Sequence, residues 1–349
     1  MLKKKIKKIA IVFVFSVLIL TGLYVRTSLQ TNGDGGFNRM FIPHALGKTK
    51  TIDLGLNSFY ISGLDSQHIY LSNWTASTYL LISGPTLSQI DTFHIQLADS
   101  LKKFFFACSV SNRTLFFDDP NHNIILYSTF PFQHIQNYHF TTIPYFNALL
   151  PVSSGSVVLR TFKKTRKQNI LTKLSGVRPF ILEMPQILKQ GDEGYFSTDG
   201  TLCLDQSSNQ LSYVYRYRNS FIVMDTNLNL IHQSQTIDTT DHPHLNISSY
   251  ADKDKVSTTF SSPPFEVNRN ACASAGLLYV CSNIRAKNEK QSVFDLFSVL
   301  DVYREKDGRY QFSFYVPKQH NRPVSSFRVD KKTLYAICDQ YISLYELSF

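Results

Sequence analysis

Asp65-Ser-Gln-His-Ile69-Tyr70 is the first of six short stretches in which a turn of small or polar residues leads into an apolar doublet. The other five are Ser111-Asn-Arg-Thr-Leu115-Phe116, Ser153-Ser-Gly-Ser-Val157-Val158, Asp199-Gly-Thr-Leu202 with Cys203, Ser274-Ala-Gly-Leu-Leu278-Tyr279 and Asp330-Lys-Lys-Thr-Leu334-Tyr335. Measured from one doublet to the next, the steps are 46, 42, 45, 76 and 56 residues. Because a four-stranded propeller blade takes about 40–50 residues, this spacing predicts an all-β, six-bladed β-propeller with extra chain between blades four and five.

The last blade is short, because only three strands fit between Ser325 and Phe349. A candidate for the missing fourth strand lies near the other end of the chain, at Lys48-Thr-Lys-Thr-Ile-Asp-Leu54. Pairing this strand with the last blade closes the ring and removes an exposed sheet edge. The sequence therefore predicts a propeller closed by an N-terminal strand.

The amino-terminal residues have the pattern of a membrane anchor. Residues 1–8 form a basic flank, and residues 9–25 are 17 consecutive residues without a charge. Such a helix would be about 25 Å long, near the lower limit for a membrane span. We expect a transmembrane signal anchor with the lysines in the cytoplasm, a flexible glycine-rich linker over residues 26–36, and the propeller over residues 37–349. A cleaved signal peptide is the alternative, although Leu23-Tyr-Val-Arg26 lacks small residues for cleavage.

This anchor predicts a single-pass protein of the cell inner membrane with a periplasmic or otherwise extracytoplasmic C-terminal domain. The net charge is +10, but the first 26 residues carry six basic residues and no acid, which leaves 30 basic against 26 acidic residues. Nucleic acid is therefore not an expected partner. The cluster Arg160, Lys163, Lys164, Arg166 and Lys167 is interpreted as a solvated hairpin loop.

The five cysteines, an odd number, all lie in apolar surroundings and are expected to be buried as small apolar residues. A Cys272–Cys281 disulfide across a hairpin is the alternative. The expected innermost strands carry no carboxylates, which argues against propeller hydrolases and lactonases that hold a metal there. No nucleophile elbow, P-loop or dinucleotide fingerprint occurs, so we expect neither catalytic residues nor a cofactor.

The best candidates for a site lie around the long connection from about Thr239 to Arg269. Within it, Asp241-His-Pro-His244 offers a carboxylate and two imidazoles, a weak candidate for a metal site. Asn268 and Arg269 come just before an inner strand and are expected near the channel mouth. Arg216 and Arg218 lie among tyrosines and are candidates for ligand or partner contacts.

The turn-and-doublet pattern resembles the NHL and TolB-like six-bladed propellers, in which a D-G-x-[LIV]-Y-V segment joins the innermost strand to the second. Asp199-Gly-Thr-Leu202 keeps that turn best, while Asp65–Tyr70 and Asp330–Tyr335 match in part. The chain is also similar to membrane-anchored propellers of Bacteroidota. That similarity rests on Phe37-Asn-Arg39, Pro43-His44, Asp53-Leu54, Tyr60-Ile-Ser-Gly63, Ile69-Tyr70-Leu71 and Thr236-Ile-Asp238. The resemblance implies a fold and an extracytoplasmic location, and it brings no assigned active site.

Together these features predict a non-catalytic, membrane-tethered propeller that binds a protein partner or a small ligand through loops at one face of the ring. A metal-assisted hydrolase or lactonase that uses the Asp241–His244 loop is the alternative, and a structural subunit of an envelope complex is a third possibility.

Overall fold

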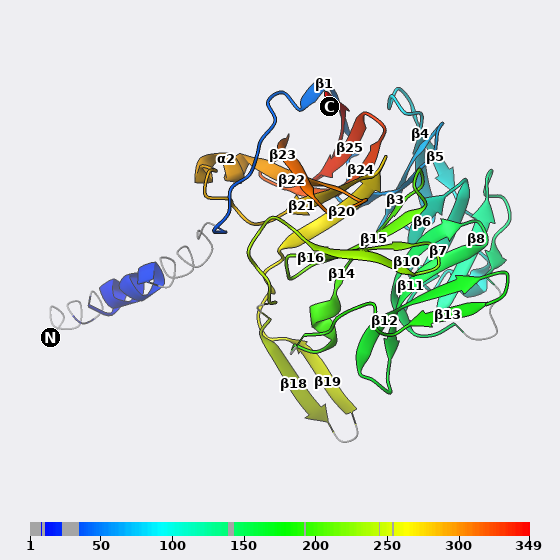
Figure 1. Ribbon diagram of the computed structural model, residues 1–349, viewed down its shortest axis with the longest axis horizontal. Coiled ribbons are helices and arrows are strands. Elements are labelled where there is room, and N and C mark those ends of the chain that lie inside the picture. Colours follow the sequence, from blue (N-terminus) through cyan, green and yellow to red (C-terminus); the bar gives the residue numbers. More distant parts are fainter. Residues whose placement is uncertain are drawn as a thin grey trace.

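The structure is a computed structural model that describes residue 8 and residues 11–22, 35–138, 143–191, 193–243, 245–252 and 255–349. Six four-stranded antiparallel sheets form the ring, and they are the blades of a six-bladed β-propeller (Figure 1). The inner strands contact one another in sequence order around the ring, and the last inner strand contacts the first. The predicted all-β, six-bladed fold is therefore confirmed.

Each blade begins with its inner strand and continues outward. Blade one contains β2 (Phe59–Leu64), β3 (Ile69–Asn73), β4 (Tyr79–Ser83) and β5 (Ile90–His94). Blade two contains β6 (Ala107–Ser111), β7 (Thr114–Asp119), β8 (Ile124–Thr129) and β9 (Gln136–Asn137). Blade three contains β10 (Phe146–Ser153), β11 (Ser156–Lys163), β12 (Gln168–Ser175) and β13 (Ile181–Met184). Blade four contains β14 (Gly200–Asp205), β15 (Gln210–Tyr215), β16 (Ser220–Asp225) and β17 (Leu230–Gln235). Blade five contains β20 (Asn268–Ser274), β21 (Leu277–Ser282), β22 (Phe297–Arg304) and β23 (Tyr310–Pro317). Blade six contains β24 (Val324–Asp330), β25 (Thr333–Cys338), β26 (Tyr341–Leu347) and β1 (Leu46–Asp53).

The ring has two faces, which are named here by the direction of the inner strands. The entry face is where inner strands begin, as at Phe59 and Gly200, and the turn face is where they turn into the second strands, as at Asp65 and Asp205. Burial is highest in the second strands, because adjacent blades cover both of their surfaces. All residues of β3 and β7 are buried, whereas the outer strands β5 and β17 contain no buried residue.

The ring closes as predicted, because β1 pairs with β26 in the sheet order β1-β26-β25-β24. The register places Thr51 opposite Ser343, and their hydroxyls are 2.8 Å apart. Asp53 accepts two hydrogen bonds from the Gln340 amide, at 2.8 and 2.9 Å. This antiparallel seam joins the first strand of the ring to the last.

Residues 35–41 cross the entry face of blade five before β1 begins, and Arg39 attaches them to that blade. Its side chain is fully buried and forms ion pairs with Asp301 and Glu289. The Arg39 guanidinium donates at 2.7 and 2.9 Å to Asp301, and further bonds go to the Ile284 carbonyl and the Ser282 hydroxyl. Burial alone would lower the pKa of Arg39, but the two carboxylates raise it.

Blade four corrects one sequence assignment. The apolar pair Tyr195-Phe196 predicts an inner strand, but Tyr195–Thr198 form a 3-10 helix, and Gly200 begins the inner strand β14. A Cβ on Gly200 would lie 2.4 Å from the Val214 carbonyl oxygen, so this Asp-Gly pair serves close packing of two strands rather than a turn. In blade four, the turn between the inner and second strands is Asp205-Gln-Ser-Ser-Asn-Gln-Leu211. With Leu211 as the start of the doublet, the spacings to the doublets of blades three and five become 54 and 67 residues in place of 45 and 76.

The connection between blades four and five also differs from expectation. It contains the antiparallel hairpin of β18 (Ile247–Asp252) and β19 (Lys255–Phe260), which projects away from the six sheets (Figure 1). A short helix, α2 (Gln291–Leu296), follows within blade five. The long connection is therefore not a strandless loop.

All five cysteines are buried and free, so the alternative of a Cys272–Cys281 disulfide is wrong. The β20–β21 register places Cys272 opposite Tyr279 and Cys281 opposite Asn270. The solvated interpretation of the basic cluster is wrong for Arg160, which is buried in β11 and pairs with Asp199 at 2.5 Å.

Residues 11–22 are helical. Among the residues that the structure describes, no helix has the length and apolar character needed to cross a membrane. The remaining residues of the predicted anchor, 9, 10 and 23–25, and residues 26–34 of the predicted linker lie outside the described residues.

Candidate functional site

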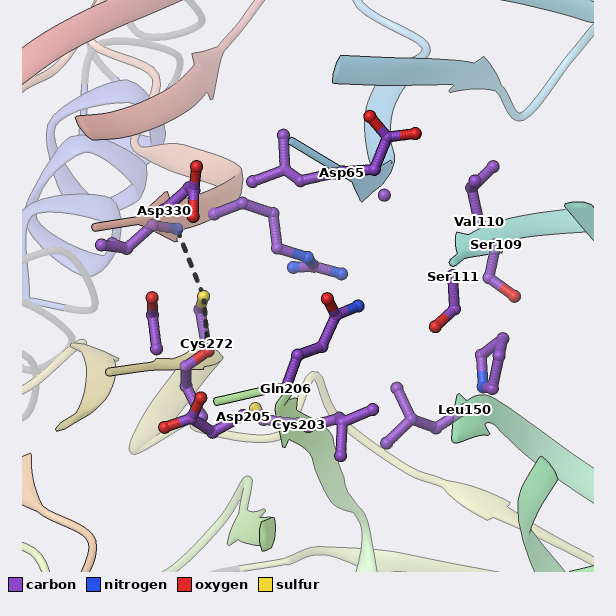
Figure 2. Close-up of a pocket in the computed structure, with 18 of the residues that line it drawn as sticks. Asp65, Ser109, Val110, Ser111, Leu150, Cys203, Asp205, Gln206, Cys272 and Asp330 are labelled. Atoms are coloured by element: carbon purple, nitrogen blue, oxygen red, sulfur yellow. Dashed lines mark hydrogen bonds between the residues drawn. The ribbon is translucent and has the colours of Figure 1, made fainter. Parts of the chain in front are cut away.

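A cavity of about 530 Å³ occupies the turn-face end of the central channel (Figure 2). All six inner strands contribute to its wall: β2, β6, β10, β14, β20 and β24. Gln206, Ser207, Ala275 and Lys331 lie in the turns at its rim and are exposed, so the mouth of this channel cavity opens on the turn face.

Arg328 is the charged residue deepest in this cavity. On β24 the lining runs from Arg328 to Lys331, and the strand turns directly after it, so Arg328 is that blade's lining residue farthest from the mouth. Its guanidinium donates one hydrogen bond, at 2.9 Å, to the Phe327 carbonyl. No carboxylate of the described chain lies within ion-pair distance of it.

The charge of Arg328 extends to two thiols, one in blade four and one in blade five. Burial raises the pKa of Cys203 on β14 and of Cys272 on β20, and the Arg328 guanidinium partly offsets the rise at both. Both cysteines also line the cavity (Figure 2). The positive charge therefore acts on the cavity wall of blades four and five as well as on its own blade.

Neutral polar groups line the blade-two side. Ser109 and Ser111 lie together on β6 (Figure 2), and neither buried hydroxyl has a hydrogen-bond partner within the described part of the chain. Buried hydroxyls normally find a partner in the protein or in ordered water. The Ser62 hydroxyl, in contrast, donates to the Tyr70 carbonyl at 3.1 Å.

Two carboxylates near the mouth already accept hydrogen bonds from donors of the protein. Asp65 accepts from the Tyr70 hydroxyl at 2.7 Å and from the N–H groups of Gln67 and His68. Asp205 accepts from Ser207 and, at 2.6 Å, from the Gly276 N–H. Burial alone would raise the pKa of Asp205, but these donors lower it.

Glu305 is a buried acid behind Asp205. Burial raises the pKa of its carboxyl to about 7, although the Ser212 hydroxyl donates to it at 2.7 Å. The neighbouring Asp205 carboxyl raises the pKa of Glu305 further. The Ser212–Glu305 hydrogen bond joins blade four to blade five.

Blade three supplies an apolar wall, formed by Leu149, Leu150 and Pro151 on β10. The blades contact one another in sequence order, so in a ring of six blade three lies diametrically opposite blade six. The guanidinium of Arg328 and the apolar wall are therefore on opposite sides of the same cavity.

None of the described residues predicted for the site lines this cavity. Asp241 and His242 are exposed on the entry-face connection, with their side chains 3.7 Å apart. His244 lies outside the described residues. Within the described chain, no three His, Cys, Asp or Glu side chains group in a way that could hold a metal ion.

The other four predicted residues make structural contacts at the entry face. The buried Asn268 amide donates to the carbonyls of Tyr215 and Arg218, at 2.9 and 3.1 Å. Arg216 pairs with Glu266 at 2.8 Å and lies 3.7 Å from Asp199. Arg218 stacks on the Tyr215 ring, 3.9 Å from its centroid, and Arg269 donates to Asn283. The contacts of Asn268 and Arg216 join blade four to the chain that leads into blade five, whereas the Arg218–Tyr215 and Arg269–Asn283 contacts lie within one blade.

A second buried acid lies near the entry face, on the side of blade two. Burial and the neighbouring Asp119 raise the pKa of Asp118 to about 7. Asp118 pairs with Ala107 at the start of β6. The stacked rings of Tyr60 and Trp74 are also at this face, with centroids 4.0 Å apart.

Sequence reasoning missed the channel cavity because it searched the inner strands for carboxylates. The usable signal was Arg328 itself, an arginine in an inner strand beside the fully buried Phe327. An isolated charge in such a strand has to face either the channel or a neighbouring blade.

Comparison with known proteins supports the fold. No protein-family profile and no curated protein matches the chain. Among solved structures, a member of the DUF4221 family from Bacteroides vulgatus has a TM-score of 0.55 at 12% identity, with 90% of this chain and 99% of that chain covered. A streptogramin B lyase structure has a TM-score of 0.50 at 11% identity, with 86% and 98% covered.

At these identities the similarity concerns the fold alone. The chain is a six-bladed β-propeller, closed by its first strand, with a cavity in its channel.

Proposed function

We propose that this protein is a membrane-tethered binding protein that holds a small ligand in the channel cavity, outside the cytoplasm, and does not transform it. The observation that carries the proposal is the cavity of about 530 Å³ built jointly by six inner strands. Small-molecule sites are typically concave, of about 300–1,000 Å³, with apolar walls and few polar groups. A rigid ring holds such a cavity ready without reorganisation, which favours binding.

The amino-terminal pattern supports the tether. Six basic residues and no acids occur in residues 1–26, around an uncharged run over residues 9–25. In this proposal, residues 37–349 form the propeller domain and residues 26–36 the linker. Positive flanks stay in the cytoplasm, which places the propeller on the other side of the membrane.

The docking of residues 35–39 supports an orientation for the tethered ring. The Gly35 N–H donates to the Arg285 carbonyl at 2.8 Å, and the Thr239 hydroxyl donates to the Gly35 carbonyl. Arg285 follows the second strand of blade five, and Thr239 follows the outer strand of blade four, so both lie at the entry face. The linker thus reaches the face opposite the cavity mouth, and the mouth is directed away from the membrane.

A cavity-filling variant tests ligand binding. We would purify the full-length protein from its own membranes in mild detergent and identify small molecules released on denaturation by mass spectrometry. Leu150→Trp fills the cavity, so a stoichiometric molecule should be lost from that variant. Leu296→Trp, at a residue of α2 that is 58% exposed, should retain it. A released molecule that is equally abundant in both variants, or none at all, would contradict the proposal.

The location has its own test. Alkaline phosphatase fused after the last strand should be active in intact cells, because the enzyme needs export to form its disulfides. Membrane fractionation should keep the fusion in the pellet after a high-salt wash. An inactive fusion, or release into the soluble fraction, would contradict the tethered arrangement.

A further inference from the structure

The charge of Arg328 is the feature of the channel cavity that most restricts its ligand. Arg328 is partly buried, and a guanidinium that is withdrawn in part from water favours an anionic partner. Within the described chain, Arg328 has one carbonyl partner and no carboxylate partner. A guanidinium has five N–H donors in a planar fork that matches a carboxylate or phosphate, so most of the binding capacity of Arg328 is unused.

The nearby acids do not supply this missing partner. Asp65 accepts hydrogen bonds from its own turn and from Tyr70, and Asp205 accepts from Ser207 and from the Gly276 N–H of blade five. Asp330 is two residues beyond Arg328 on the same strand, at the mouth of the cavity. Lys331 also lies at the rim, so the three carboxylates leave the mouth with a net negative charge while Arg328 makes the interior positive. This arrangement matters for the charge of the ligand.

A monoanion fits this distribution of charge better than a dianion. One guanidinium neutralises one negative charge, and the second charge of a phosphate monoester would face a mouth that carries three carboxylates against one lysine. An inorganic anion would also leave the apolar wall of Leu149, Leu150 and Pro151 without contact. An organic body of moderate size buries that wall and gains the hydrophobic contribution.

We infer that the ligand of the channel cavity is a small organic monocarboxylate, held at its carboxylate by Arg328 and packed through its apolar body against Leu149–Pro151 of the opposite blade. This inference rests on the proposed binding function and adds the ligand's chemical class. The unpartnered hydroxyls of Ser109 and Ser111 line the wall of blade two, between these two ends.

Three matched probes test the inference: 3-phenylpropionate, 3-phenylpropanol and 3-phenylpropyl phosphate. They share one apolar body and differ only in the head group. Titration calorimetry on the full-length protein in lipid nanodiscs should rank the carboxylate above the phosphate and the alcohol. Arg328→Gln should weaken carboxylate binding about ten- to a hundred-fold, as expected for a charge-assisted hydrogen bond, and should leave alcohol binding unchanged.

Two further variants keep the result interpretable. Arg328→Lys retains the charge without the planar fork and should recover part of the affinity. Arg322→Gln removes an exposed arginine of the entry face and should change nothing. Circular dichroism of every variant establishes that the sheets are intact.

The outcomes separate this inference from the function on which it rests. If the alcohol binds as tightly as the carboxylate, or Arg328→Gln binds normally, while Leu150→Trp abolishes binding, the cavity is a binding site and the carboxylate assignment is wrong. If no probe binds and no small molecule copurifies, both are wrong.

Discussion

Replacing Arg39 by methionine should destabilise the ring more than any other single charge change described above. The side chain keeps most of its length but loses four described contacts within hydrogen-bond distance: two to Asp301, one to the Ile284 carbonyl and one to the Ser282 hydroxyl. It also loses the ion pair with Glu289. Both carboxylates then remain buried without their counter-charge.

The magnitude follows from burial. The side chains of Arg39 and Glu289 are 0% exposed and that of Asp301 is 2% exposed. Removing one member of a buried pair typically costs about 3–5 kcal/mol, because an uncompensated charge is left inside the protein. Urea denaturation of the full-length protein in detergent, followed by circular dichroism, measures the free energy of unfolding and its change.

A double-mutant cycle isolates the cause. Arg39→Met combined with Asp301→Asn should cost clearly less than the sum of the two single changes, because the second change removes a stranded charge. Arg304→Met is the matched control: it breaks an Arg–Asp pair of similar geometry on the surface, and its unfolding midpoint should stay near that of the wild type. A loss below about 1 kcal/mol in Arg39→Met, or strict additivity in the cycle, would refute the reasoning.

Three further results are expected. Folding raises the pKa of Asp118 from 3.8 to about 7, so the native state holds an extra proton between these values and loses stability as the pH rises through them. At pH 8, Asp118→Asn should therefore be more stable than the wild type by up to roughly 4 kcal/mol. If the difference in urea midpoint between variant and wild type were the same at pH 5 and pH 8, the reasoning would be contradicted. Gly200→Ala places a Cβ 2.4 Å from the Val214 carbonyl and 2.7 Å from the Tyr213 ring and should cost about 1–3 kcal/mol, whereas Gly155→Ala, with open space around it, should not. Iodoacetamide should label none of the five buried cysteines before urea unfolds the protein, and labelling of the native protein detected by mass spectrometry would disagree with their burial.

The blade count and the ring closure could be read from the sequence, because they depend on local signals. Second strands such as β3 and β7 are buried on both surfaces, which forces an apolar run after each turn. The closing strand followed from the absence of a fourth strand after Leu347. Both inferences need only the order of elements along the chain.

Two elements were assigned wrongly from the sequence, the turn of blade four and the connection between blades four and five. Asp199-Gly200 has the composition of a turn, but here the glycine allows β14 to approach β15. The hairpin β18–β19 was missed because its strands are rich in Ser and Thr and lack a regular apolar alternation.

The channel cavity was beyond sequence reasoning for a geometric reason. Its wall combines residues from six blades that are separated by tens to hundreds of positions, and alternation along an inner strand does not tell which side chains face the axis. Asn268 was expected near the channel mouth, and Arg216 and Arg218 were candidates for ligand or partner contacts, yet none of the three lines the cavity. The contacts of Asn268 and Arg216 instead join blade four to the chain that leads into blade five.

The seam between β1 and β26 determines when the ring can form during synthesis. β1 leaves the ribosome before any blade is complete, and its partner strand emerges only after the last inner strand. Until then the growing chain is an open arc with an unpaired edge at each end, the kind of edge that recruits strands from other molecules. A chain that terminates before Tyr341 lacks β26, the partner of β1, and cannot close the ring. Early termination should therefore lead to aggregation or proteolysis rather than to a smaller closed propeller.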